Sequence, residues 1–165
     1  MPSSLPYRIG CLAIAVCVAM TVAACGGDSG TEPLDPALVA MEHATYDAIN
    51  KHRADSGFSS LIYDDFIAQQ AREHSRAMAD GKVPFGHDGF ADRVSAIAQH
   101  LRTSVAAENV AFNLGVSDPS ATAVSDWLNS PGHLANIEGD FTATGVGVAR
   151  RSDGAYFFTQ IFIKQ

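Results

Sequence analysis

The chain has 165 residues, and its 11 lysines and arginines are outnumbered by 18 aspartates and glutamates, so its formal net charge at pH 7 is −7. The acidic residues are scattered rather than massed in a tail, and no basic cluster is present. Because binding to nucleic acid requires a concentrated positive surface, no nucleic acid is expected as a partner.

The N-terminal segment predicts an export signal. Arg8 is followed by an uncharged, mainly apolar run over residues 10–24. This run is shorter than the about 20 apolar residues that a membrane-spanning helix needs, and it ends in small residues, so a cleaved segment is the better interpretation. We expect residues 1–24 to be a lipoprotein signal peptide that plays no part in the fold.

The residue that follows this signal is a cysteine. The sequence Val22-Ala23-Ala24-Cys25 resembles a bacterial lipobox, in which the cysteine is lipidated and becomes the first mature residue. Residues 25–35 contain Gly, Ser and Pro, as expected of a flexible tether. If Cys25 is lipidated, the protein is extracytoplasmic, in the bacterial cell envelope, and the acyl chains on Cys25 anchor it to a membrane. The alternative is an ordinary secretory signal cut near Ala24, with Cys25 an incidental thiol.

The positions of the cysteines constrain the folded part. Cys11 and Cys17 leave with the signal, Cys25 is the anchor, and residues 26–165 contain no cysteine. The domain therefore has neither a disulfide nor a thiolate metal ligand, and its hydrophobic core must hold it together. The about 130 residues over 36–165 correspond to one domain of ordinary size.

Cap signals and the spacing of apolar residues predict three helices in the first half of this domain. Asp35-Pro36 is typical of an N-cap followed by proline at the first helical position, and the helical pattern then extends over residues 36–55. A second cap at Asp64-Asp65 begins a helix that ends at Asp80-Gly81. After a glycine-flanked turn, apolar residues over 90–101 predict a third, shorter helix.

The next segments predict a strand and a fourth helix. Residues 107–112 are too few before the next glycine for a helix, and as a strand they place Glu108 and Val110 on one face. Asp118-Pro119 opens a helix that we expect to end at Pro131-Gly132. His133 is therefore expected in the turn after that helix.

The C-terminal region predicts a β-hairpin. Residues 144–149 and 155–162 are strand-like and are joined by Arg151-Ser152-Asp153-Gly154, a hairpin signal. Helices come first and the hairpin last. This order predicts an α+β fold in which helices pack on an antiparallel sheet, not a doubly wound parallel sheet.

Two of the six histidines are candidate site residues. His87 and His133 adjoin glycines in segments where the backbone can direct a side chain into a cleft. The other four have simpler explanations: His74 as a satisfied core histidine, and His43, His52 and His100 as solvated residues of helical stretches.

Two neutral imidazoles are candidate ligands for a divalent cation, and Glu108 would add an oxygen donor or orient one ring. These residues lie far apart in the sequence, and no short metal-binding pattern is present. Glu108 could equally be a structural carboxylate that accepts backbone N–H bonds. Ser130 lies near His133, but no nucleophile elbow surrounds it.

A series of motifs runs in order along residues 38–165. They are Ile49-Asn50-x-His52-Arg53, Leu61-x-Tyr63-Asp64, Ala71-x-x-His74-Ser75-x-x-Met78, Gly86-His87, Glu108-Asn109, Trp127-x-x-Ser130-Pro131-Gly132-His133-x-x-Asn136-Ile137, Thr144-Gly145-Val146-Gly147 and Thr159-Gln160-Ile161-Phe162. In this order they resemble a known family, the CAP superfamily of cysteine-rich secretory, antigen 5 and pathogenesis-related 1 proteins, in its cysteine-free bacterial SCP-like branch.

The resemblance implies a three-layer α-β-α sandwich with a central, mainly antiparallel sheet. It also implies a cleft lined by two His and two Glu, which in some members binds a divalent cation such as zinc. His87, Glu108 and His133 match three of these positions, whereas Ser130 stands where many eukaryotic members have the second Glu. Two neutral imidazoles and one carboxylate should hold a cation more weakly than the full set, and Glu108 alone remains as a candidate general base.

Three classes of function remain open at this point. The first is a non-enzymatic module that binds a lipid, a sterol-like molecule, a peptide or a cell-wall component. The second is a metal-dependent hydrolase or protease, in which a cation on His87 and His133 would lower the pKa of bound water and Glu108 would take a proton. The third is a structural envelope protein whose polar cluster only stabilises the cleft.

Overall fold

The computed structural model describes residues 33–165, so the predicted signal peptide and the predicted lipidation site at Cys25 lie outside the described residues. None of the helices in this part of the chain is long and apolar enough to cross a membrane. The elements are α1 (Pro36–Asp55), β1 (Ile62–Tyr63), α2 (Asp65–Ala79), α3 (Phe90–Ala98), β2 (Val105–Asn113), α4 (Pro119–Leu128), α5 (Pro131–Ile137), β3 (Ala143–Arg150) and β4 (Tyr156–Lys164).

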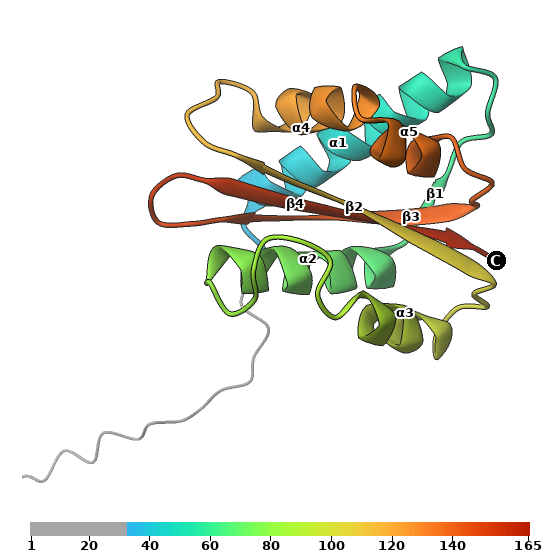
Figure 1. Ribbon diagram of the computed structural model, residues 1–165, viewed down its shortest axis with the longest axis horizontal. Coiled ribbons are helices and arrows are strands. Elements are labelled where there is room, and N and C mark those ends of the chain that lie inside the picture. The colour runs from blue at the N-terminus through green and yellow to red at the C-terminus, as the bar shows by residue number, and fades with distance from the viewer. Residues whose placement is uncertain (1–32) are drawn as a thin grey trace, which may run out of the picture. The chain divides into compact units, whose positions relative to one another are not determined.

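The strands form one sheet in the order β1-β3-β4-β2. The short strand β1 is parallel to β3, and the other two pairings are antiparallel. Helices α1, α4 and α5 cover one face of the sheet, and α2 and α3 cover the other (Figure 1). The fold is therefore a three-layer α-β-α sandwich with a mainly antiparallel sheet, as predicted.

The predicted helix starts are confirmed by their caps. Asp35 accepts a hydrogen bond from the backbone N–H of Ala37 at 2.9 Å, and α1 has the predicted bounds. Asp64 caps α2 and Asp118 caps α4 in the same way. Each carboxylate satisfies an N–H group that has no partner within the helix.

The predicted strand over 107–112 is confirmed but is longer than the sequence suggested. Strand β2 pairs with β4 from Val105 opposite Lys164 to Asn113 opposite Tyr156. The extra residues become part of the strand because they pair with a distant segment. The local sequence does not reveal this pairing.

The prediction that Pro131-Gly132 leaves His133 in a turn is wrong. Only Asn129 and Ser130 separate α4 from α5, and Pro131 is the first residue of α5. Proline is favourable there, because the first helical N–H has no intrahelical partner to lose. His133 consequently lies on a helix, which fixes its direction more firmly than a turn would.

Two glycines of β3 allow α2 to pack directly against the sheet. A Cβ atom at Gly145 would overlap the backbone of Ala68, and one at Gly147 would overlap the backbone of Arg72. The Gly145-x-Gly147 pattern therefore has a packing cause, a close approach of helix and strand backbones.

Side chains from the helices reach both edges of the sheet. At the β2 edge, Trp127 Nε1 donates to the carbonyl of Val110 at 2.9 Å. At the other edge β1 covers only the start of β3, and further along Glu42 of α1 accepts from the N–H of Val148 at 3.1 Å. Arg72 of α2 binds Glu42 with its Nη2 atom 2.7 Å from Oε2, which links the two helical layers around this edge.

Candidate functional site

The candidate site forms around the edge strand β2, because adjacent residues of a strand face opposite sides of the sheet. Glu108 faces the α2–α3 layer, and Asn109 faces α5. Asn109 donates to the carbonyl of His133 at 3.2 Å, and Asn136 donates to Oδ1 of Asn109 at 2.9 Å. The Glu-Asn pair thus places a carboxylate on one side of the strand and fixes the helix that carries His133 on the other.

Glu108 is buried and its carboxylate is fully engaged. Arg93 of α3 donates from Nε to Oε2 at 2.9 Å and from Nη2 to Oε1 at 2.8 Å. Nδ1 of His87 lies 3.0 Å from Oε1. This two-pronged pairing with a guanidinium is the strong form of a salt bridge, and it leaves neither oxygen without a partner.

His87 lies in the loop between α2 and α3, and its hydrogen bond fixes its orientation. A carboxylate oxygen accepts, so the contact with Glu108 assigns the proton to Nδ1 and leaves Nε2 as the free nitrogen of the neutral ring. The His87 side chain is 52% exposed, whereas that of Glu108 is 1% exposed. The site therefore presents an oriented imidazole to solvent beside a buried carboxylate.

His74 of α2 is a satisfied core histidine, as predicted. Its Nε2 lies 2.8 Å from the carbonyl of Gly86, which can only accept, and its Nδ1 lies 3.1 Å from Nη1 of Arg93, which can only donate. Burial lowers the pKa of His74 below its ordinary value, and the positive charge of Arg93 contributes to this. The ring is neutral at neutral pH and holds the loop that carries His87.

Arg93 is the site residue that sequence reasoning missed. It contacts Glu108 and His74, and its Nη1 also donates to the carbonyl of Asp88 at 2.8 Å. An arginine on a short amphipathic helix is ordinarily a solvated residue. The sequence contains one hint, because Arg93 lies in the first turn of the helix that follows the His87 loop.

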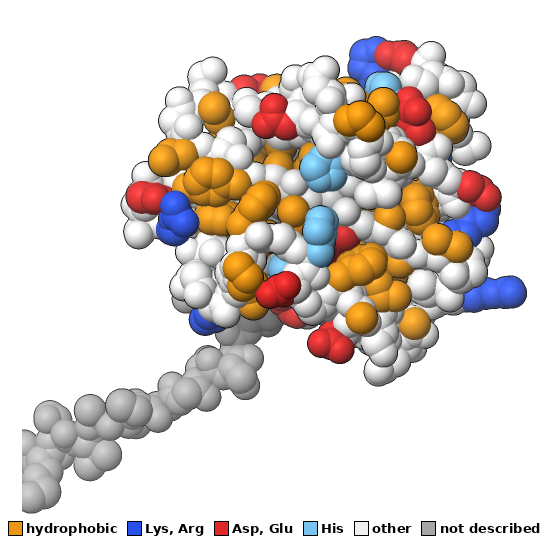
Figure 2. All heavy atoms as spheres, viewed as in Figure 1, with side chains coloured by type: hydrophobic (Ala, Val, Ile, Leu, Met, Phe, Trp, Pro, Cys, Tyr) orange, Lys and Arg blue, Asp and Glu red, His pale blue; other side chains and the backbone are white. Residues whose placement is uncertain are grey.

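His133 lies on α5, close enough to His87 of the α2–α3 loop for the charges of the two rings to interact. Its Nδ1 is buried and has no hydrogen-bond partner among the described residues. Burial lowers the pKa of His133, and the nearby ring of His87 lowers it further. Figure 2 shows two histidine side chains close together near the middle of one face, with apolar side chains on both sides.

The remaining candidates contribute less directly. Ser130 occupies the N-cap position of α5 but makes no capping hydrogen bond. Within residues 33–165, no hydrogen bond joins its hydroxyl to the three cleft residues His87, Glu108 and His133. His43 and His100 are exposed, as expected. His52 is only partly exposed, because its Nε2 lies 3.0 Å from Glu138, so the prediction that it is solvated is wrong.

The donor set does not fit a catalytic metal centre. Within the described part of the chain, no three His, Cys, Asp or Glu side chains are grouped to hold a metal ion. Arg93 occupies the Glu108 carboxylate and adds a positive charge beside it. Two imidazoles remain, whereas catalytic zinc sites commonly have three protein ligands. Binding of a cation by His87 and His133 alone remains a prediction.

The same fold occurs in solved structures of bacterial proteins. An extracellular protein with an SCP domain from Bacillus anthracis has 29% identity and a TM-score of 0.65, over 82% of this chain and 45% of that one. An outer surface protein from Borrelia burgdorferi has 22% identity and a TM-score of 0.62, over 73% and 89%. A cysteine-rich secretory protein from Staphylococcus aureus has 19% identity and a TM-score of 0.62, over 81% and 41%. The chain thus spans less than half of the Bacillus and Staphylococcus proteins.

A search of curated proteins by sequence found no match. The family model described as CAP, the cysteine-rich secretory protein family, matches residues 46–162. The matched range contains His87, Glu108 and His133 but no cysteine. The chain therefore belongs to the CAP family.

Proposed function

We propose that this protein is a non-enzymatic binding module, held at the outer side of a bacterial membrane by lipidated Cys25. Its cleft, formed by His87, Glu108 and His133, receives a lipid, a peptide or a cell-wall component. The observation that carries this proposal is the unused hydrogen-bonding capacity of two neighbouring imidazoles. His87 presents Nε2 to solvent, and Nδ1 of His133 is buried without a partner among the described residues. Buried polar atoms are ordinarily satisfied, so a ligand atom would complete this site.

The engagement of Glu108 argues against the hydrolase alternative. A general base needs a free lone pair within reach of the proton that it takes. Both Glu108 oxygens already accept hydrogen bonds from Arg93, and one also contacts His87. We therefore derive no hydrolytic step from this site.

A divalent cation such as zinc is a second candidate occupant of the cleft. Burial and the neighbouring ring of His87 lower the pKa of His133, which keeps this imidazole neutral as a metal ligand must be. Titration calorimetry with zinc should show weak binding that His87→Ala abolishes. Binding that survives this substitution would place the cation elsewhere.

The test of the main proposal is ligand retention by the cleft. The Cys25→Ser variant, which cannot be acylated, would be incubated with phospholipid vesicles or with peptidoglycan fragments, and the molecules that stay bound would be identified by mass spectrometry. The double variant His87→Ala, His133→Ala should lose the retained ligand, while His100→Ala, an exposed histidine outside the cleft, should keep it. If the double variant only lowers the melting temperature and retains the same ligand, the structural envelope reading is correct instead.

The anchor is tested separately, by mass spectrometry of the mature N-terminus. The solved relatives described above are an extracellular, an outer surface and a secretory protein, which supports an extracytoplasmic location. We expect a diacyl or triacyl modification on Cys25, because stable anchoring needs more than one acyl chain. An unmodified Cys25 would contradict membrane anchoring but would leave the cleft untouched.

A further inference from the structure

The chain contains three Asp-Gly pairs, and all of them lie in turns between elements. Asp80-Gly81 follows α2, Asp88-Gly89 precedes α3, and Asp153-Gly154 lies between β3 and β4. All three aspartates are exposed. The three glycines have a left-handed backbone, with φ angles of 68°, 76° and 92°. Because exposure and glycine conformation are alike, the hydrogen bonds of the three pairs are what distinguishes them.

An Asp-Gly pair can rearrange in water without an enzyme. The amide nitrogen of the glycine attacks the side-chain carboxyl carbon of the aspartate, and the amide hydrogen leaves with the carboxyl hydroxyl as water. This closes a succinimide ring, in which glycine favours the attack because no side chain hinders its nitrogen. Water then cleaves the original peptide bond, so the main chain runs through the side-chain carboxyl group and the residue becomes isoaspartate. The water lost in the first step is regained in the second, so no other reactant is needed.

The rearrangement needs two free groups, the N–H of the glycine and the carboxyl group of the aspartate. At Asp80-Gly81 both groups are engaged. The N–H of Gly81 donates to the carbonyl of Met78 at 3.1 Å, and Nζ of Lys82 lies 2.8 Å from Oδ2 of Asp80. Both contacts must break before the ring can close.

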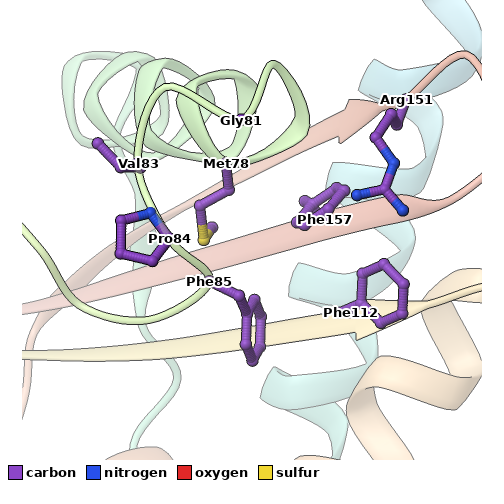
Figure 3. Close-up of a pocket in the computed structure, with 8 residues that line it drawn as sticks. All are labelled: Met78, Gly81, Val83, Pro84, Phe85, Phe112, Arg151 and Phe157. Carbon is purple, nitrogen blue, oxygen red and sulfur yellow. The ribbon is translucent and has the colours of Figure 1, made fainter.

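The Asp153-Gly154 pair is held by more contacts. The N–H of Gly154 donates to the carbonyl of Arg151 at 2.9 Å. The Asp153 carboxylate accepts from Nε and Nη2 of Arg151 and from the N–H of Ala155. The Arg151 guanidinium lies 5.2 Å from the ring centroid of Phe157, and Figure 3 shows it beside this ring among the side chains that line an apolar pocket. This packing fixes the guanidinium that holds Asp153.

The Asp88-Gly89 pair is free at both groups. Within residues 33–165, neither the N–H of Gly89 nor the carboxylate of Asp88 makes a hydrogen bond. The carbonyl of Asp88 accepts from Nη1 of Arg93 at 2.8 Å, and this is the hydrogen bond that holds the peptide unit between the two residues. The Asp88 carboxyl group can turn towards the nitrogen of Gly89 when that single bond opens.

We propose that Asp88-Gly89 is the pair that forms isoaspartate spontaneously in the folded protein. Asp80 and Asp153 are protected, because their carboxylates and the N–H groups of the glycines that follow them are already bonded. The reaction needs only water, so it does not depend on the proposed binding function.

The position of Asp88 gives this rearrangement a consequence for the candidate site. Isoaspartate adds one CH2 group to the main chain between His87 and Arg93. Both of these residues contact the Glu108 carboxylate, so a longer main chain between them would displace at least one from it. Rearrangement at Asp88 would therefore disrupt the site without changing the mass of the protein.

The experiment follows the uptake of heavy oxygen by the full chain, kept near neutral pH in isotope-enriched water. Hydrolysis of each succinimide leaves a labelled oxygen in the aspartate or isoaspartate, and mass spectrometry of peptides locates it. In the folded protein Asp88 should be labelled about tenfold faster than Asp80 and Asp153, because fewer hydrogen bonds must break there. In urea the three rates should converge, because these hydrogen bonds are lost.

Asp88→Glu is the matched control. It keeps the charge, but its ring would be one atom larger and closes far more slowly, so labelling at this position should disappear. Arg151→Gln should speed the labelling of Asp153 and leave that of Asp88 unchanged. Equal rates at the three aspartates in the folded protein, or faster labelling of Asp80 or Asp153 than of Asp88, would overturn the proposal.

The consequence for the site has its own measurement. The isoaspartate form, separated by ion-exchange chromatography, should melt at a lower temperature than the fresh protein, because contacts of the buried Glu108 carboxylate are lost. An unchanged melting temperature would overturn the disruption of the site, while the labelling rates would still decide where the isoaspartate forms.

Discussion

Two Glu–Arg pairs lie at opposite edges of the sheet and have different roles. Glu42 and Arg72 join α1 to α2 at the β3 edge, and Glu108 and Arg93 join β2 to α3 at the β2 edge. Both carboxylates are almost fully buried, and both accept from two guanidinium nitrogens. The charges and geometry are alike, so the difference must come from the third partner of each carboxylate.

The third partner of Glu42 is a backbone group. Glu42 accepts a hydrogen bond from the N–H of Val148 at the β3 edge, so all of its hydrogen bonds are made within the fold. Burial raises the pKa of Tyr63 beside the pair to about 12, and the charge of Glu42 contributes, so this phenol stays protonated and does not titrate near neutral pH. The third partner of Glu108 is His87, which faces solvent. Whether a buried ion pair is structural or supports a site therefore depends on the third group that its carboxylate binds.

The largest expected effect on stability comes from breaking the Glu42–Arg72 pair. Glu42→Gln removes the charge that compensates Arg72 and weakens the bond to the N–H of Val148. Breaking a buried pair costs about 3–5 kcal/mol of unfolding free energy. Urea denaturation followed by far-UV circular dichroism would measure this loss. A loss under about 1 kcal/mol would show that the pair does not join the layers as described.

The same substitution at the other edge should cost less. Glu108→Gln leaves Arg93 its contact with the carbonyl of Asp88, and His87 can turn to solvent, so we expect a loss of about 1–3 kcal/mol. Urea denaturation of Glu108→Gln beside Glu42→Gln, followed by far-UV circular dichroism, would measure the difference. If Glu108→Gln is as costly as Glu42→Gln, the contrast between the two edges fails.

A smaller effect should appear in the pH dependence of stability. Burial lowers the pKa of His74 in the folded state; the hydrogen bond to Gly86 and the charge of Glu108 oppose this, and the charges of Arg93 and His87 add to it. The unfolded chain then binds the proton more readily, so stability is present above the ordinary pKa of about 6.5 and is lost as the pH falls below it. His74→Gln can keep both hydrogen bonds but cannot titrate. Its melting temperature should fall less than that of the unsubstituted protein between about pH 7.5 and 5.5; equal slopes would assign the effect to other groups.

The smallest effect on stability is expected from an exposed pair of opposite charges. Lys51 lies 2.6 Å from Asp55 on α1, with side chains 75% and 64% exposed. Lys51→Ala should change the unfolding free energy by no more than about 0.5 kcal/mol, because water and salt screen such pairs. A loss close to that of Glu108→Gln would mean that burial is not what separates these pairs.

The parts of the fold that local chemistry determines could be predicted from the sequence. The caps at Asp35, Asp64 and Asp118 fixed the helix starts, and the turn around Gly154 fixed the hairpin. The start of α5 was misread, because Pro131 is compatible both with the end of one helix and with the first position of the next.

Only some residues of the site could be predicted from the sequence. His87, Glu108 and His133 stand out because each is a polar residue within a distinctive motif. Arg93 does not stand out, since its partner Glu108 lies on a different element, and only the packing of α3 against β2 brings the two together. The pocket lined by Phe85, Phe112 and Phe157 was not predicted for the same reason, because the three residues come from separate segments.

The side chains at the sheet edges also bear on aggregation. An edge strand with free N–H and C=O groups is a template for a strand of another molecule. At the β2 edge, the carbonyls of Glu108 and Val110 already accept from Asn136 and Trp127. A second chain would have to displace helix side chains before it could extend the sheet there. These contacts would therefore keep β2 from starting a fibre when the protein is concentrated.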